Sequence, residues 1–139
     1  MGVVFLEDDP GRLRAFRSMC PRATYFIDAN VMVASMRQWL PTATLISLDH
    51  DLPFRRDEHG VLHDNGTGRQ VADALAAELP RCPVILHTSN HDAMLGMRRV
   101  LTDGGWQVRV VTPEPGTRWV EREWLVTADR LLHGGGGGG

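Results

Sequence analysis

Short apolar runs that end in polar residues are the feature that most constrains how this chain can fold. Val3–Leu6, Leu45–Leu48 and Val84–Leu86 each lead directly into acids, histidines or hydroxyl groups. Uninterrupted runs of Val, Ile and Leu are typical of strands that are buried on both faces of a parallel sheet. Ligands bind beyond the carboxyl ends of such strands. We therefore expect the polar residues that follow the three runs to share one cleft.

The rest of the chain alternates between strand and helix patterns. We expect five strands, at residues 3–6, 23–27, 44–48, 83–86 and 106–111. We also expect five helices: one that begins after Asp9, one over 31–40, one through 71–79, one from Asn90 to Leu101 and one over 119–132. Parallel strands need right-handed helical crossovers. The pattern therefore predicts one α/β domain, residues 1–133, built as a three-layer sandwich around a five-stranded parallel sheet.

Two segments fall outside this alternation. Residues 52–67 form a polar connection of about 16 residues, which is longer than most and indicates a lid or a binding loop. Residues 134–139 are all glycine and are expected to form a disordered tail.

The composition is that of an ordinary globular domain. Of the 139 residues, 42% are hydrophobic and 23% are charged, and the formal net charge of −2 gives no global attraction to nucleic acid or membranes. No apolar run approaches the roughly 20 residues of a membrane span, and no signal peptide is evident. Cys20 and Cys82 lack metal-ligand spacing, so we expect them to be reduced in a cytoplasmic protein. All fifteen basic residues are arginine, which excludes any lysine-dependent mechanism.

Three acids are candidate metal ligands. Glu7 and Asp8 follow the first strand, and Asp49 follows the third. Carboxylates are the hard oxygen ligands that Mg²⁺ prefers, and a divalent cation would relieve the repulsion among them. The alternative is that Asp8 or Asp9 simply caps the first helix.

Two histidines are candidate catalytic residues. His50 and His87 follow adjacent strands of the expected sheet, and histidine is the side chain best suited to general acid–base chemistry near neutral pH. One could activate water on one side of a phosphodiester while the other protonates the leaving oxygen. Equally, either could be a satisfied member of a packed polar network. Asp51 could orient a histidine, extend the metal site or cap a turn.

The segment after the fourth strand is a candidate phosphate site. Thr88, Ser89 and Asn90 lie where that strand leads into a helix, and amides at a helix N-terminus bind anions. Asn90 could instead be a plain helix cap. Trp119 and Trp124 are expected in the core or an interface rather than as platforms for stacking bases.

These motifs resemble response-regulator receiver domains over almost the whole chain. VVFLEDDPGRLRAF is similar to the start of a receiver, in which an acidic pair helps to hold Mg²⁺; Glu7 and Asp8 match that pair. LISLDHDLP resembles the segment with the phospho-accepting aspartate, matched by Asp49, and PVILHTS places Thr88 at the hydroxyl position. The resemblance implies a flavodoxin-like strand order of 2-1-3-4-5.

The chain departs from ordinary receivers in ways that resemble one divergent group. Receivers carry a lysine before a proline after the fifth strand, where this chain has Thr112-Pro113, and they seldom carry the two histidines. S-L-D-H-D-L together with H-T-S-N is similar to the cyclic-phosphate-processing receiver-like (cREC) domains. That resemblance implies a phosphoesterase acting on cyclic phosphate ends of nucleotides or RNA.

Two other functions stay open on the sequence. The first is an atypical receiver or pseudo-receiver, a signalling module that works with a partner protein. The second is a metal-dependent phosphatase of another kind, with Asp49 as the nucleophile.

Overall fold

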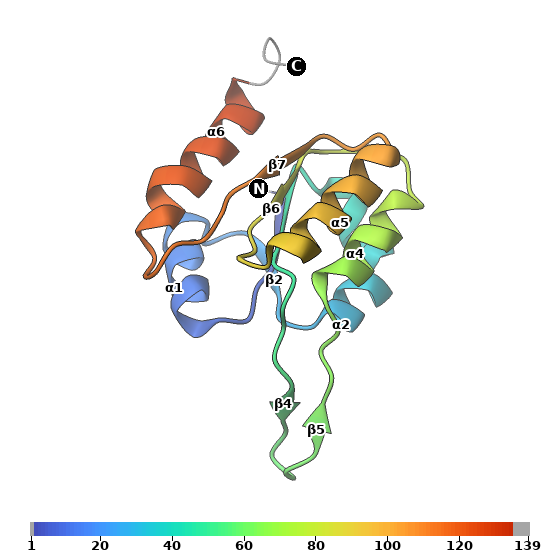
Figure 1. Ribbon diagram of the computed structural model, residues 1–139, viewed down its shortest axis with the longest axis vertical. Coiled ribbons are helices and arrows are strands. Elements are labelled where there is room, and N and C mark those ends of the chain that lie inside the picture. Colours follow the sequence, from blue (N-terminus) through green and yellow to red (C-terminus); the bar gives the residue numbers. More distant parts are fainter. Residues whose placement is uncertain (1, 135–139) are drawn as a thin grey trace.

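The computed structural model describes residues 2–134 and shows a five-stranded parallel sheet in the order β2-β1-β3-β6-β7. This is the predicted order 2-1-3-4-5, and it confirms the flavodoxin-like sandwich (Figure 1). The main strands are β1 (Val3–Leu6), β2 (Thr24–Phe26), β3 (Leu45–Leu48), β6 (Val84–Leu86) and β7 (Val108–Val110). The main helices are α1 (Pro10–Met19), α2 (Ala29–Ala34), α3 (Met36–Trp39), α4 (Gly68–Ala76), α5 (His91–Asp103) and α6 (Leu125–His133).

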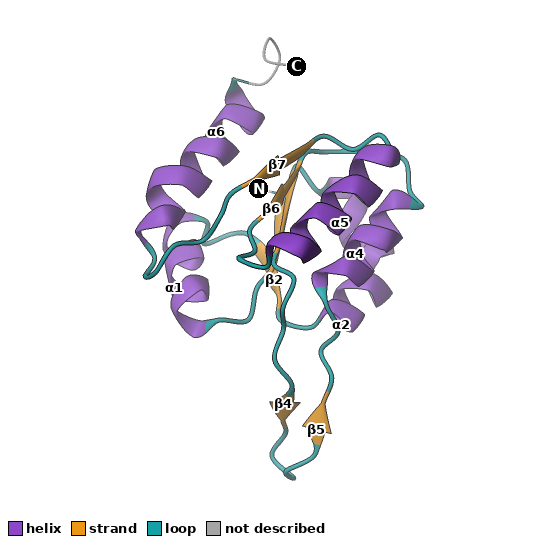
Figure 2. Cartoon of the chain, viewed as in Figure 1, coloured by secondary structure: helices purple, strands orange, loops and turns teal. Residues whose placement is uncertain are grey.

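Helices cover both faces of the sheet (Figure 2). α1 and α6 lie on one face, and α2, α4 and α5 lie on the other (Figure 1). Side chains alternate along each strand, so Ile85 joins the cluster under α1 and α6 while Leu86 joins the cluster under the other helices. Trp119 and Trp124 belong to the cluster under α1 and α6, where each side chain is 1% exposed, and this confirms their expected place in the core.

One expected helix, residues 31–40, is wrong in its bounds and in its continuity. Asp28 accepts hydrogen bonds from the N–H groups of Asn30 and Val31, so α2 begins at Ala29. The helix then breaks at Ser35, whose hydroxyl donates to the Val31 carbonyl at 2.8 Å. The break separates α2 from α3, and a 3₁₀ turn, Leu40–Thr42, ends the segment.

The expected loop over residues 52–67 contains a small β-hairpin. β4 (Arg55–Arg56) pairs with β5 (Leu62–His63) in an antiparallel ribbon, and Figure 1 shows it extending away from the sheet. At its base, Asn65 donates to the Pro53 carbonyl, and Asp51 forms a bridge with Thr67. The hairpin is therefore anchored beside the residues that follow β3.

The C-terminal helix expected over 119–132 is present. It contains a π-helical turn, Val120–Trp124, that leads directly into α6. The glycine tail predicted at 134–139 lies, except for Gly134, outside the described residues. Over the part of the chain that the structure describes, no helix has the length and apolar character needed to cross a membrane.

Candidate active site

The carboxyl edge of the sheet brings three predicted strand endings to one level. Leu6, Leu48 and Leu86 are paired in register on β1, β3 and β6. The next residue on each strand is Glu7, Asp49 or His87, and each is fixed by a backbone hydrogen bond to the neighbouring strand. The prediction that polar groups converge at this edge therefore holds for these three side chains.

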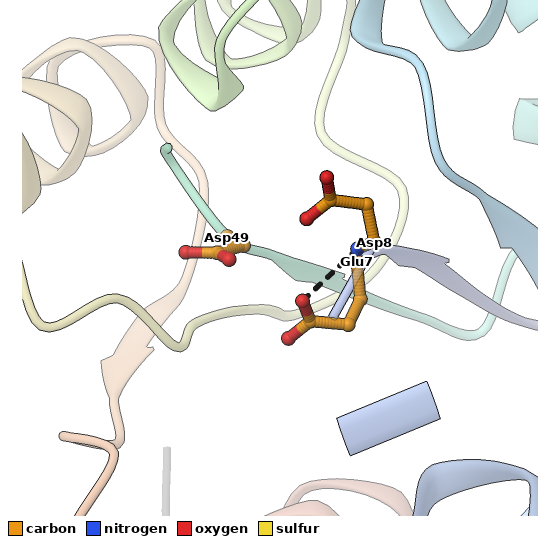
Figure 3. Close-up of side chains that lie close together, drawn as sticks. All are labelled: Glu7, Asp8 and Asp49. Atoms are coloured by element: carbon orange, nitrogen blue, oxygen red, sulfur yellow. Dashed lines mark hydrogen bonds between the residues drawn. The ribbon is translucent and has the colours of Figure 1, made fainter. Parts of the chain in front are cut away.

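Glu7, Asp8 and Asp49 form a compact group of acids. Each offers an oxygen, and these oxygens lie within 4.8 Å of one another (Figure 3). Glu7 is fully buried, and its Oε2 accepts hydrogen bonds from the N–H groups of Asp8 and Asp9, each at 3.0 Å. Burial alone would raise the pKa of Glu7, but His87, the Asp9 N–H and Arg12 together hold that pKa below its usual value. Glu7 therefore favours its charged form more than an ordinary glutamate does.

The other two acids hold protons more readily. Burial raises the pKa of Asp49 to about 6, and Glu7 adds to the rise while His87, the His50 N–H and Arg12 oppose it. Burial and the charge of Glu7 also raise the pKa of Asp8. Neighbouring carboxyls with unlike pKa values are typical of sites that handle protons or cations.

Arg12 is a residue of this site that the sequence analysis missed. Its Nη1 lies 3.6 Å from Glu7 Oε1 and 3.5 Å from Asp49 Oδ2, and its guanidinium carbon lies 5.5 Å from the centre of the Trp119 ring. A signal was present in the spacing, because Arg12 is four residues before the buried Phe16 and shares its side of α1. This arginine supplies a cation beside Asp49 in a chain that has no lysine.

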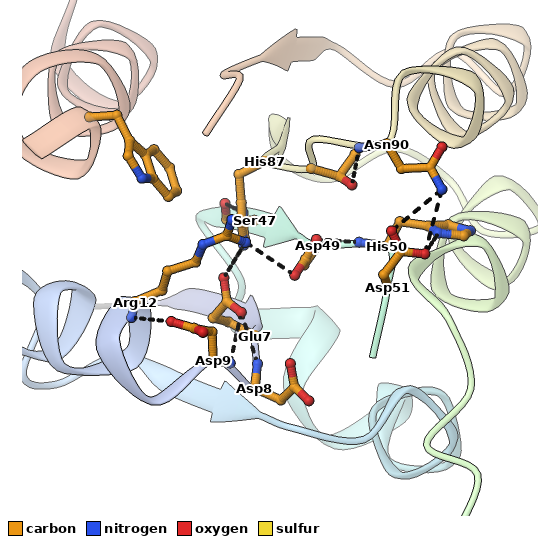
Figure 4. A network of polar contacts seen from close by, with 12 residues as sticks. Glu7, Asp8, Asp9, Arg12, Ser47, Asp49, His50, Asp51, His87 and Asn90 are labelled. Carbon is orange, nitrogen blue, oxygen red and sulfur yellow. Dashed lines mark hydrogen bonds and ion pairs between the residues drawn. The ribbon is translucent and has the colours of Figure 1, made fainter. Parts of the chain in front are cut away.

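His87 belongs to a buried hydrogen-bonded chain. Trp124 Nε1 donates to Ser47 Oγ at 2.8 Å. Ser47 Oγ is hydrogen-bonded to His87 Nδ1 at 2.6 Å (Figure 4). The other ring nitrogen of His87, Nε2, lies 3.2 Å from Glu7 Oε1. The geometry of that approach falls short of a hydrogen bond, so neither atom has such a partner among the described residues. His87 is 0% exposed and thus contacts protein groups only.

His50 lies elsewhere, and the expectation that both histidines face one cleft is corrected here. His50 Nδ1 is 2.8 Å from Asp51 Oδ1, and Asn90 Nδ2 lies 3.4 Å from Asp51 Oδ2. In Figure 4 the two histidines stand on opposite sides of Asp49. His87 points into the layer of α1 and α6, where it contacts Phe16 and Trp119. Alternation along β6 places His87 on the same face as Ile85, which accounts for its burial.

The segment after β6 is used mainly for capping. The Asn90 side chain accepts from the Ala93 N–H at 3.0 Å, and the Thr88 hydroxyl accepts from the Asn90 N–H at 3.1 Å. Thr88 is buried, whereas Ser89 is exposed and lines the cleft described next. Capping by Asn90, one of the two roles considered for it, is therefore present.

An open cleft of about 270 Å³ lies over the acids. It takes its walls from the loops after β1, β3 and β6, and the Arg12 side chain enters it from α1. Its lining residues are Asp8, Asp9, Pro10, Arg12, Asp49, Asp51, Pro53 and Ser89. Asp9 also caps α1 by accepting from the Arg12 N–H at 2.9 Å, so the cap helps to fix the arginine that faces Asp49.

Comparison with solved structures places the chain in a class. The crystal structure of a response regulator receiver domain from Rhodospirillum rubrum is similar, with a TM-score of 0.60 and 19% identity over 86% of this chain and 85% of that chain. At this identity the likeness shows the fold alone, and the chain is a receiver-fold domain. The family model for the cyclic-phosphate processing receiver domain matches residues 3–103, so the chain belongs to that family. A search of curated proteins finds no match.

Proposed function

We propose that this protein is a phosphoesterase that opens cyclic phosphate ends of nucleotides or RNA. One observation carries the proposal: a guanidinium lies within 3.6 Å of two buried carboxylates, in an open cleft that also contains the acid of a His–Asp pair. A phosphoryl group needs cations to offset its charge and a group that moves a proton. Arg12 lines the cleft and suits the first task, and Asp51, which also lines the cleft, holds His50, the candidate for the second.

Arg12 is proposed to bind the phosphoryl oxygens. Arginine presents several N–H donors in a planar fork that suits phosphate. The contact of its guanidinium with the Trp119 ring orients it beside the cleft. Ser89 also lines the cleft and is proposed to offer its hydroxyl group to the same phosphate, which is the part of the predicted Thr88–Asn90 cradle that stays available.

His50 is proposed to move the proton. Its Nδ1 is held by Asp51, a lining residue of the cleft, so Nε2 is left as the basic atom. His50 would accept the proton of the attacking water and return it to the oxygen that leaves the ring. His87 cannot take the second catalytic role in this arrangement; we propose that it positions Glu7 instead.

The acids fit a divalent cation by their chemistry. The buried Glu7 Oε1 has no hydrogen-bond partner within the described chain, and Glu7, Asp8 and Asp49 are hard oxygen donors that would together hold Mg²⁺. When bound, such an ion would polarise a phosphoryl oxygen. Because Arg12 contacts Glu7 and Asp49, the ion and the guanidinium would both offset the negative charge of these two acids.

Turnover of 2′,3′-cyclic nucleotides, with Mg²⁺ or with EDTA, tests the proposal. We expect wild-type hydrolysis, and a loss of about 10²-fold or more in kcat for His50→Ala, since general acid–base catalysis typically contributes that much. Arg12→Lys should retain more activity than Arg12→Ala, because it keeps the charge but loses the fork. His133→Ala, which changes an exposed histidine on α6, is the matched control. No turnover by the wild type over a broad panel of cyclic phosphates would contradict the proposal.

A signalling role is the second candidate, and the placement of Asp49 and Thr88 favours it. Asp49 follows β3 and Thr88 follows the neighbouring strand β6, which matches the places that the resemblance to receivers assigns to the phospho-acceptor and the hydroxyl. Acetyl phosphate and intact-mass measurement would separate the two functions. A stable adduct that disappears in Asp49→Asn favours signalling with a partner protein, whereas an adduct seen only during turnover favours a phosphatase with Asp49 as nucleophile.

A further inference from the structure

A second, larger groove adjoins the cleft and is lined by arginine. It has a volume of about 590 Å³, within the range of about 300–1,000 Å³ that small-molecule pockets occupy. Asp8 and Pro10 line both the groove and the cleft, so the two cavities share a wall. The remaining lining residues are Leu13, Arg14, Arg17, Ile27 and Arg55.

The positive charge of the groove is not neutralised within the protein. Among the described residues, Arg14, Arg17 and Arg55 form no ion pair, as is true of most arginines in this chain; only Arg12, Arg69 and Arg99 do. Arg14 and Arg17 are three apart on α1 and so lie on one side of the helix. Arg55 comes from β4 of the hairpin, close enough to Asp8 for its charge to lower the pKa of that acid. Three guanidiniums thus face a single carboxylate.

The floor of the groove is apolar. Leu13 and Pro10 come from the start of α1, and Ile27 follows β2. Arg17 lies over the Tyr25 ring at 5.1 Å, which orients its guanidinium. An apolar floor beneath arginine side chains suits a ligand with flat apolar faces and repeated negative charges, which is the chemistry of a nucleotide strand.

We propose that this arginine groove binds the strand that leads to the phosphate in the cleft, so that the preferred substrate is a short single-stranded oligonucleotide rather than a mononucleotide. The inference rests on the proposed function, since it takes the end of that strand to be the cyclic phosphate. The groove then supplies binding energy through phosphates remote from the reacting bond.

Binding can be measured without turnover, which separates this inference from the proposed function. A labelled short single-stranded RNA with a 3′-phosphate is titrated with the wild type and with Arg14→Ala/Arg17→Ala, and anisotropy is followed at several salt concentrations. We expect the double variant to bind at least about tenfold more weakly. Its salt slope should be smaller by about 1.4, because each lost phosphate contact to a single strand removes about 0.7.

The matched control is Arg98→Ala/Arg99→Ala, which removes the same charge from exposed positions on α5 outside the groove. Arg55→Ala, on a separate element, gives an independent test should the α1 variant fail to fold. Equal weakening by the control and the groove variants would overturn the inference, as would inorganic polyphosphate of matched charge competing as well as RNA does.

Kinetics provide the second readout. For the wild type, we expect kcat/KM for an oligonucleotide that ends in a 2′,3′-cyclic phosphate to exceed that for the cyclic mononucleotide, and this ratio should fall about tenfold or more in the groove variants. A ratio near one in the wild type would overturn the groove inference while the phosphoesterase proposal stands. RNA binding without hydrolysis of any cyclic phosphate would contradict the phosphoesterase proposal and leave the groove as a binding site.

Discussion

Glu7 and Asp49 are neighbouring buried carboxyls whose surroundings move their pKa values in opposite directions. Glu7 accepts hydrogen bonds from two backbone N–H groups, whereas Asp49 accepts one, from the His50 N–H at 2.7 Å. Asp49 also lies beside the carboxylate of Glu7, whose charge raises the pKa of Asp49. The site therefore keeps one carboxyl that favours its charged form and one carboxyl that titrates near neutral pH.

Replacing Asp49 should stabilise the fold at neutral and alkaline pH. The pKa of Asp49 is about 6 in the folded state against 3.8 for the free side chain, so the folded state binds the proton more tightly between those values. By linkage, this residue lowers the free energy of unfolding as the pH rises from about 4 to 6. We expect Asp49→Asn to raise the free energy of unfolding by about 1–3 kcal/mol at pH 8 and by little at pH 4.

Urea unfolding at pH 4, 6 and 8 measures this effect. Asp103→Asn, at an exposed position on α5, is the control and should show no such trend. If Asp49→Asn instead lowers the free energy of unfolding at pH 8, the lost contact with Arg12 costs more than is gained by no longer burying a charged carboxylate.

His87 should matter more for stability than for contact with substrate. His87→Ala leaves a cavity beside Phe16, and it leaves Glu7 as a buried charge without its neighbouring ring. Truncating a buried ring and leaving a buried charge without its neighbour typically costs about 3–5 kcal/mol. We expect a loss of that order in the free energy of unfolding, part of which Glu7→Gln in the double variant restores. A full double-mutant cycle by urea denaturation checks this, and strictly additive effects would contradict it.

At the scale of the elements, α4 begins directly against the loop that follows β3. The Gly68 N–H donates to the His50 carbonyl at 3.0 Å, and Thr67 with Gln70 forms a capping box that fixes this end of the helix. Only glycine fits at position 68, because an added Cβ would overlap the Asp49 carbonyl oxygen. The start of α4 thus sets the backbone position of the residues that follow β3.

Gly68→Ala should displace Asp49 and weaken the fold by about 1–3 kcal/mol, the usual cost of overpacking. Gly96→Ala is the matched control, since its Cβ would meet only the flexible end of Arg69 on an otherwise helical site. There the better helix propensity of alanine should make the change neutral or stabilising. Thermal melts compare the two, and an equal loss of stability in both variants would contradict the role given to Gly68.

Element bounds were predictable where a single local signal dominates. Asp9 with Pro10 and Asn90 each mark a helix start that the structure keeps. The break at Ser35 was not predictable from periodicity, because it depends on the Trp39 Nε1 donating to the Met32 carbonyl, a contact that only the folded segment creates. The hairpin at 55–63 was missed because its two-residue strands are too short to show alternation.

At the scale of the whole molecule, the parallel sheet and the meeting of Glu7, Asp8 and Asp49 followed from the buried apolar runs, and the strand order followed from the resemblance to receivers. The separation of His50 from His87 could have been predicted, since His87 follows Ile85 by two residues and so shares its face of β6. The role of Arg12 and the partners of His87 could not be predicted. Trp124 Nε1 and Ser47 Oγ, for example, are 77 residues apart in the sequence and meet only through tertiary packing.

The C-terminal segment should be essential to the fold although the family model ends at residue 103. α6 and the π-helical turn before it cover the face of the sheet that contains Phe5, Phe16 and Ile85, and Trp124 supplies the N–H that orients the Ser47–His87 pair. A chain truncated after Thr117 would expose this apolar cluster to water and leave the pair without its donor. Burying two tryptophan side chains stabilises a fold by several kcal/mol, which is comparable to the net stability of a domain of this size.

We therefore expect the truncated chain to lose cooperative unfolding and to bind a hydrophobic dye, as measured by thermal circular dichroism and dye fluorescence. A chain that ends at Gly134 is the control and should melt like the full-length protein. A cooperative melt from the chain that ends at Thr117 would show instead that the residues up to Thr117 fold independently and that α6 is an addition to them.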